Sequence, residues 1–161
     1  MIRLFQTDAS KSRAFQRLVL AAVMFPHGAQ KLFGWFGGYG FDGTMGYLTT
    51  NVGLPAAVAL LVILAETFGA LALAAGALSR VTAFGIGAVM VGAVLTGHLS
   101  HGFFMNWSGT NAGEGFEYHL LALALCLPLI VKGGGAWSLD SMFARKLEKA
   151  APSRSTASSH A

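Results

Sequence analysis

Apolar residues dominate four stretches of the chain, at residues 15–33, 54–78, 81–98 and 116–131. Each stretch is close to the about 20 mainly apolar residues that a helix needs to cross a bilayer. The second is the most uniformly apolar, with Pro55 near its start, where a helix tolerates proline, and Glu66 as its single charge. The fourth ends before Lys132 and the glycines at 133–135. This pattern predicts an all-α fold, an integral membrane four-helix bundle.

The bundle, residues 15–135, is flanked by shorter segments. Residues 1–14 form an N-terminal segment, which we expect in the cytoplasm. Residues 136–149 alternate apolar and charged positions as in a short amphipathic helix at the membrane interface, with Ser138 as its N-cap. Residues 150–161 are rich in Ser and Ala, and we expect them to be disordered.

Composition supports a membrane protein and excludes several other classes. The chain is 54% apolar and 11% charged, and its mean hydropathy is +0.58, which is unlike a soluble domain. The single cysteine, Cys126, excludes an intramolecular disulfide and a paired-cysteine redox motif. The net charge of +4 comes from basic residues near the two ends of the chain, without a dense patch, so we expect no nucleic-acid partner.

The basic residues also predict the orientation. They precede the first span, occupy the turn between the second and third, and follow the fourth: Arg3, Lys11, Arg13, Arg17, Arg80, Lys132, Arg145, Lys146, Lys149 and Arg154. The connections on the other side offer only Lys31, at a helix end. Because positive charge favours the cytoplasmic side, both termini are expected in the cytoplasm.

Polar side chains gather at the outer ends of the predicted spans. His27 and Lys31 lie one turn apart in the first span and so share a face. Pro26 leaves the carbonyl of Ala22 without its helical donor, which favours a kink. Glu66 lies about 18 Å into the second span, at ~1.5 Å per residue. An ionised carboxylate at that depth costs at least about 2.5 kcal/mol, so we expect it to be neutral, hydrated or paired.

The third and fourth spans bring more polar residues to the same level. The third ends at His98, and the fourth begins with Glu117, Tyr118 and His119. Successive helical residues differ by about 100°, so Glu117 and His119 point nearly opposite ways, and we expect Glu117 to face the bundle. The result is a predicted outward-opening pocket in which two carboxylates relay protons and four side chains bind substrate: Glu66 and Glu117, then His27, Lys31, His98 and Tyr118.

Each of these residues also has a simpler interpretation. Lys31 can extend to the membrane interface, and His27 can cap the proline kink. His119 is compatible with an ordinary hydrogen-bonding role, and Tyr118 with an interfacial anchor. Glu66 is the hardest to explain by structure alone, because an ionisable residue within the membrane is a functional candidate by default.

The order of several motifs resembles the DoxX family of small four-span bacterial membrane proteins. The motifs are HGAQKLFGWFGGYG at 27–40, DGTMGYL at 42–48, AETFGALAL at 65–73, LSR at 78–80, GHLSHGFF at 97–104, EYHLL at 117–121 and WSLD at 137–140. The resemblance departs from the family pattern at His101, where Asn is common, and at Gly134, where a Gly-Pro-Gly turn is usual. It implies a bacterial inner-membrane location and a link to quinone chemistry or redox stress.

Several functions are compatible with these residues. The favoured one is a redox-associated subunit that binds a quinone or small aromatic molecule, with electrons from a redox partner protein, because quinone carbonyls need hydrogen-bond donors. A haem held by His27 and His98, or a metal on His and Glu side chains, is an open alternative. Transport of a small molecule or protons, by a homodimer, uses the same residues. A non-catalytic scaffold is the remaining alternative.

Overall fold

The structure is a computed structural model that describes residues 5–150, and within this range it contains helices and no strand. This confirms the all-α prediction. The helices are α2 (Lys11–Phe33), α3 (Gly40–Gly46), α4 (Ala56–Ala75), α5 (Ser79–Ala93), α6 (Glu117–Lys132) and α7 (Leu139–Ala150). Short 3-10 or π-helical turns follow α2, α3 and α5, at Trp35–Gly37, Tyr47–Asn51, and Val94–His98 with Leu99–His101. Apart from Ala150, the segment expected to be disordered lies outside the described residues.

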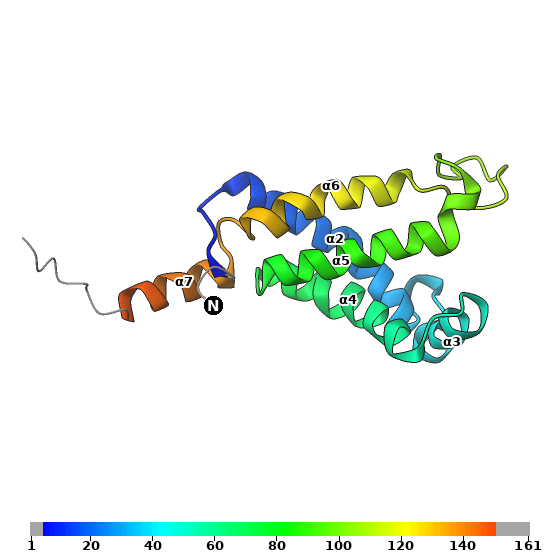
Figure 1. The fold of residues 1–161 in the computed structure, drawn as a ribbon, viewed down its shortest axis with the longest axis horizontal. Helices are drawn as coiled ribbons and strands as arrows, with labels where there is room; N and C mark the ends of the chain where they lie inside the picture. The colour runs from blue at the N-terminus through cyan, green and yellow to red at the C-terminus, as the bar shows by residue number, and fades with distance from the viewer. Residues whose placement is uncertain (1–4, 151–161) are drawn as a thin grey trace, which may run out of the picture.

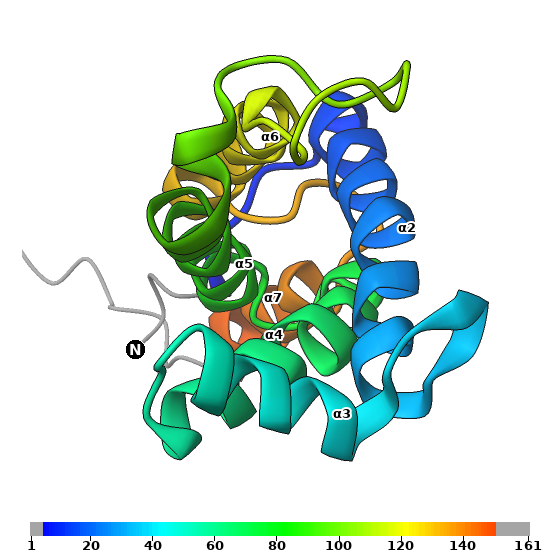
Figure 2. The same cartoon turned by 90° about the vertical axis from the view of Figure 1, so that its right-hand side faces the viewer.

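The four long helices run side by side along the longest axis of the molecule (Figure 1). Viewed along that axis, α2, α4, α5 and α6 surround a common centre (Figure 2). The end with α3 and the connection at residues 102–116 is called the loop end, and the opposite end is called the α7 end. The segment between the first two predicted spans, residues 34–53, forms α3 and a π-helical turn.

The first long helix has a defined start and stop. The side chain of Ser10 accepts a hydrogen bond from the Arg13 amide at 3.4 Å, which caps the N-terminus of α2. The helix continues through Pro26 and ends at Gly34, whose φ of 72° is a left-handed conformation that glycine adopts without strain. Gly28 touches α4: a Cβ there would lie 2.5 Å from the backbone of Glu66 and Thr67. Only glycine permits this approach of the two helices.

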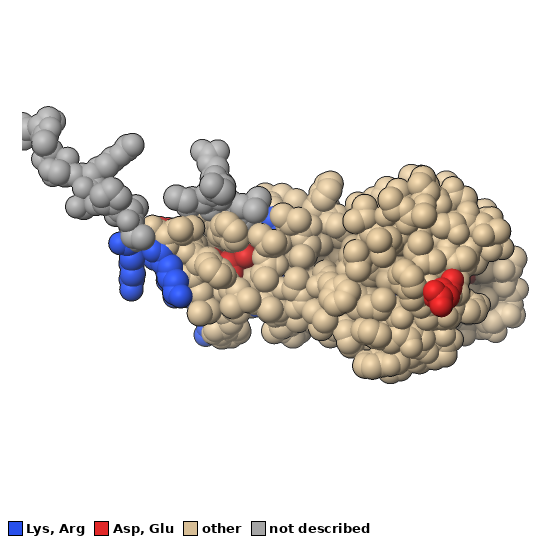
Figure 3. Space-filling model, turned by 90° about the horizontal axis from the view of Figure 1, so that it is seen from below, with Lys and Arg blue, Asp and Glu red and all other residues tan. Residues whose placement is uncertain are grey.

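The outer surface of the bundle is apolar. All four long helices carry large apolar side chains that are at least half exposed: Phe15 and Phe33 on α2, Leu61 and Phe68 on α4, Phe84 on α5, and Leu121, Leu127 and Val131 on α6. Seen from below, a broad middle region of the molecule shows no charged side chain, and Lys and Arg gather at the α7 end (Figure 3). An exposed apolar surface of this extent is typical of a lipid-facing protein.

Two helical segments of residues 5–150 are long and apolar enough to cross a membrane, Ala56–Ala75 with a mean hydropathy of 2.3 and Ser79–His101 with 1.6. The other two long helices do not meet the same criteria. α6 has 16 residues, and α2 carries several basic side chains along its 23 residues. Length and composition therefore support two of the four predicted spans.

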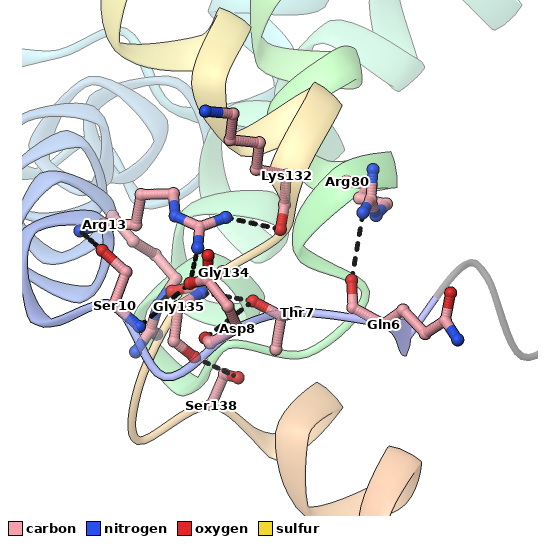
Figure 4. Close-up of polar contacts among 11 residues, drawn as sticks. Gln6, Thr7, Asp8, Ser10, Arg13, Arg80, Lys132, Gly134, Gly135 and Ser138 are labelled. Carbon is pink, nitrogen blue, oxygen red and sulfur yellow. Dashed lines mark hydrogen bonds and ion pairs between the residues drawn. The ribbon is translucent and has the colours of Figure 1, made fainter.

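At the α7 end, arginine side chains bind the carbonyl ends of the helices (Figure 4). Arg13 donates to the Lys132 carbonyl at 2.7 Å, and Arg80 to that of Ile130 at 2.9 Å, so both cap α6. Arg17, only 1% exposed, donates to the carbonyls of Leu73 at 2.6 Å and of Gly134 at 3.0 Å. Carbonyls at a helix C-terminus lack intrahelical partners, and a cation there is favourable.

α7 is fixed to the turn between α4 and α5. The hydroxyl of Ser138 accepts a hydrogen bond from the Ser141 amide at 3.2 Å, the N-terminal capping expected from the sequence. The two carboxylate oxygens of Asp140, which is 2% exposed, accept the amides of Leu78 and Ser79 at 2.8 Å each. One side chain therefore joins the start of α7 to the start of α5.

Candidate functional site

The loop-end half of the bundle contains a cavity of about 690 Å³. Its walls are α2, α4, α5 and the start of α6, and the segments at 47–54 and 105–114 lie toward its outer end. Most of its lining is apolar, and six ionisable or phenolic groups from the four helices and their extensions stand against that background: His27, Lys31, Glu66, His98, Tyr118 and His119. The α7-end half is instead filled by side chains such as Leu20, Leu73, Ile86 and Leu129.

An ion pair joins α2 to α4 in the cavity wall. Lys31 Nζ lies 2.6 Å from Glu66 Oε2, and the side chains are 28% and 4% exposed, respectively. Gly28 precedes Lys31 by about one turn and sets the short distance between the helices. Of the three states that the sequence left open for Glu66, neutral, hydrated or paired, the structure shows the paired one, so the buried carboxylate has a charged hydrogen-bond partner.

His27 and Tyr118 meet across the bundle from α2 and α6. Their ring centroids are 5.6 Å apart, and the Tyr118 hydroxyl donates weakly to Met24 Sδ at 3.4 Å. A thioether is a poor acceptor, so an oxygen atom of a ligand would be a better partner for this hydroxyl. Both side chains line the cavity, as the sequence indicated for them.

His98, in the π-helical turn that follows α5, and His119 on α6 form a second pair. Their ring centroids are 4.2 Å apart, and His98 Nδ1 lies 2.8 Å from the carbonyl oxygen of Glu114. His119 is 6% exposed, and its Nδ1 has no hydrogen-bond partner among the described residues. A buried polar atom without a partner is costly, and the side chain that carries it lines the cavity.

Glu117 lies outside the cavity lining, and the expectation that it faces the bundle in place of His119 is wrong. Its Oε1 accepts the Met105 amide at 2.9 Å and Trp107 Nε1 at 3.2 Å. Glu117 is the first residue of α6, beside a connection whose backbone amides need acceptors. Its carboxylate therefore binds this connection, and the rotation of about 200° over two residues turns His119 inward.

A family model for DoxX matches residues 13–99, more than half of the chain. The chain belongs to the DoxX family. No curated protein and no solved structure matches it. The DoxX match and the apolar helices together show a membrane protein, which contacts lipid. The matched segment contains four of the six polar cavity residues named above, His27, Lys31, Glu66 and His98, and it ends before α6.

The positions of the histidines in this DoxX chain are relevant to the two alternatives raised above, a bound haem and a bound metal ion. His27 and His98 both line the cavity, each beside a ring of α6, Tyr118 and His119 respectively. Within residues 5–150 no group of three His, Cys, Asp or Glu side chains is arranged to hold a metal ion. His101 lies outside the cavity lining, with its Nδ1 2.8 Å from the Gly97 carbonyl oxygen.

Sequence reasoning missed two residues that shape this site. The sequence contained an indication for His119, because its angular separation from Glu117 meant that one of the two side chains must face inward. It also contained an indication for Gly28, because a glycine one turn before Lys31 is typical of a close approach between helices within a membrane. Together the residues form an apolar chamber with hydrogen-bond donors and an ion pair on its walls, an arrangement suited to a small amphiphile.

Proposed function

We propose that this DoxX protein binds a quinone, or a similar small aromatic molecule, in the loop-end cavity and serves as a redox-associated subunit of a bacterial inner membrane. The observation that carries the proposal is the part-buried Lys31–Glu66 ion pair in the wall of an apolar cavity of about 690 Å³. Cavities of this size enclose small organic ligands, and a few polar groups fix their orientation.

The proposal includes a four-span topology with the loop end outward. At ~1.5 Å per residue, the 23 residues of α2 extend about 35 Å and the 16 of α6 about 24 Å. The basic residues of α2 other than Lys31 lie in its first two turns, so they do not enter the middle of the bilayer. Both helices present apolar side chains outward, including Phe15 and Leu127. This supports residues 15–135 as the membrane domain.

The basic residues near the α7 end support cytoplasmic termini. Arg13, Arg17 and Arg80 lie there, whereas Lys31, nearer the loop end, is neutralised by Glu66. α7 combines exposed apolar side chains, Met142 and Phe143 among them, with basic residues. We assign residues 136–149 to the inner membrane surface, where amphipathic helices of this kind lie.

The cavity residues would perform two tasks for such a ligand. Lys31 Nζ and Tyr118 Oη are donors for its carbonyl oxygens, and the His119 side chain lines the same cavity. Reduction of a quinone to a quinol takes up two electrons and two protons. The Glu66 carboxyl group, in contact with Lys31, is placed to pass protons, and the electrons come from a redox partner protein.

The extent of the cavity favours a one-sided pocket over a transport path. No lining residue of α4 lies beyond Glu66 toward the α7 end, and none of α2 lies before Met24. Beyond these residues the interior is filled by packed side chains, and Arg17 with its carbonyl partners closes the α7 end. A transport function requires access from both sides, which this arrangement does not offer.

Equilibrium binding of a short-tailed ubiquinone analogue to the protein in lipid nanodiscs tests the proposal. We expect saturable binding, and at least about tenfold weaker affinity, or 1.4 kcal/mol, for the double variant Lys31→Met with Glu66→Gln, which removes both charges without leaving either unpaired. The control Asp42→Asn removes an exposed carboxylate of α3, which does not line the cavity. Binding no greater than to protein-free nanodiscs would overturn the proposal.

A further inference from the structure

The cavity wall between α4 and α5 includes side chains that are also exposed on the outer surface. Val58 and Leu61 on α4 are 42% and 63% exposed, and both line the cavity. Ala88 on α5 is likewise exposed and lines the cavity. A residue that contacts both the interior and the exterior marks a place where the wall is one side chain thick.

Small residues keep this wall thin. Ala65 faces Gly85, whose Cβ position lies 3.9 Å from the Ala65 Cβ. Two turns toward the loop end, Gly92 stands at the level of Val58, because the two helices are antiparallel. A Cβ at Gly92 would meet nothing within 4 Å. The space between α4 and α5 therefore widens from Ala65 toward the loop end, and no side chain of Gly92 fills it.

This wall lies at hydrocarbon depth if the bundle spans the membrane. Leu61 is about 8 Å along α4 from its first residue, at ~1.5 Å per residue, and α4 itself is about 30 Å long, as is the hydrocarbon core. The exposed face of Leu61 then meets acyl chains and not water. Its inner face meets the chamber that holds the Lys31–Glu66 pair.

We infer that the cavity opens sideways into the bilayer between α4 and α5, around Val58, Leu61, Ala88 and Gly92, called here the lateral portal. The ligand class is then a lipophilic quinone whose headgroup lies against Lys31, Tyr118 and His119 and whose long hydrocarbon tail leaves through the portal into lipid. This inference rests on the proposed function. It adds the class of substrate and the route of entry.

The dependence of binding affinity on the length of the quinone tail tests the lateral portal. In wild-type nanodiscs, we expect a ubiquinone with a long polyprenyl tail and an analogue with a single prenyl unit to bind with affinities within about threefold, each corrected for partition into protein-free nanodiscs. The tail remains in lipid in both the free and the bound state, so its length changes the corrected affinity little. A chamber that opened only to water would exclude the long tail.

Gly92→Leu blocks the portal, and Gly69→Leu is its matched control. Gly69 also has no atom within 4 Å of its Cβ position, but it does not line the cavity. We expect Gly92→Leu to weaken long-tailed binding at least about tenfold while short-tailed binding changes less than about threefold, and Gly69→Leu to alter neither. Retained short-tailed binding shows that the variant is folded.

The outcomes separate the two proposals. Wild-type protein that binds the short-tailed analogue but rejects the long-tailed quinone would refute the portal and leave the proposed function intact. Equal losses in the two glycine variants would also refute it. If neither quinone binds the wild type, the proposed function fails and the portal fails with it.

Discussion

Glu66 is a carboxylate buried in the middle of a long apolar helix, and one side chain of a neighbouring helix neutralises it. The pair costs desolvation of two charges, which its mutual attraction offsets only in good geometry. The 2.6 Å contact provides that geometry. The two partners are not equivalent, because Lys31 is 28% exposed and can reach the rim, whereas Glu66 at 4% cannot.

Replacing Lys31 alone and replacing Glu66 alone should therefore reduce the free energy of unfolding by different amounts. Removing one partner of a buried ion pair costs about 3–5 kcal/mol, and we expect Lys31→Met to reduce the free energy of unfolding by an amount in this range. Glu66→Gln should cost less, because the freed ammonium group can turn toward the rim. The double variant should recover part of the loss. Equilibrium unfolding in mixed micelles measures all three, and purely additive losses would contradict a coupled pair.

Gly28 controls the distance across which this pair forms. We expect Gly28→Ala to destabilise the protein by about 1–3 kcal/mol, because its Cβ would collide with the α4 backbone at 2.5 Å and push the helices apart. Gly69→Ala is the control, since its Cβ position is free. The same unfolding experiment compares them, and equal stability of the two variants would show that the close approach of α2 and α4 is not required.

At the scale of elements, two carboxylates hold irregular connections that apolar patterning does not describe. Asp140 joins α7 to the turn between α4 and α5, and Glu117 joins α6 to the connection that precedes it. Both accept backbone amides that would otherwise lack partners. One carboxylate thus contributes side-chain acceptors to each of these two segments.

Asp140→Ala should release α7 without unfolding the bundle. The amides of Leu78 and Ser79 would lose their acceptor, at a cost of about 1–3 kcal/mol while they remain buried. We expect faster hydrogen exchange at these amides and faster tryptic cleavage after Arg145. Glu148→Gln, an exposed position on the same helix, is the control. Unchanged exchange in Asp140→Ala would show that α7 is held by other contacts.

Some of these elements were predictable from the sequence and others were not. The long helices follow from apolar length, and Ser138 follows from capping preference. The helix α3 was not predictable, because the glycine-rich sequence GFDGTMG has a low helix propensity. The angular separation of Glu117 and His119 indicated that one of them faces inward, but the choice between them was not predictable, because it depends on hydrogen bonds from Met105 and Trp107 to Glu117, twelve and ten residues apart. Apolar periodicity carries no information on such contacts.

At the scale of the whole molecule, charge is separated along the long axis. Basic side chains gather at the α7 end, and a broad uncharged surface separates them from the loop end (Figure 3). The arginines there bind helix C-terminal carbonyls, so the residues on which the proposed cytoplasmic orientation rests also close that end of the bundle. The proposed topology and the closed end of the cavity therefore depend on the same side chains.

The orientation can be tested with single cysteines in a background that replaces the buried Cys126 by Ala. Trp107→Cys lies at the loop end, where the native side chain is 86% exposed, and Lys146→Cys lies on α7. We expect a membrane-impermeant maleimide to label only the first in intact bacteria and both after the membrane is permeabilised. Labelling of Lys146→Cys alone in intact cells would reverse the topology.

Photolabelling with an azido-quinone, followed by mass spectrometry of the modified peptides, tests quinone binding in the cavity most directly. We predict saturable labelling of peptides that contain His27, Tyr118 or His119, which excess unlabelled quinone suppresses and the Lys31→Met, Glu66→Gln double variant abolishes. Labelling confined to lipid-facing positions such as Phe68 or Leu127, and insensitive to competitor, would show that the quinone dissolves around the protein and does not enter the cavity.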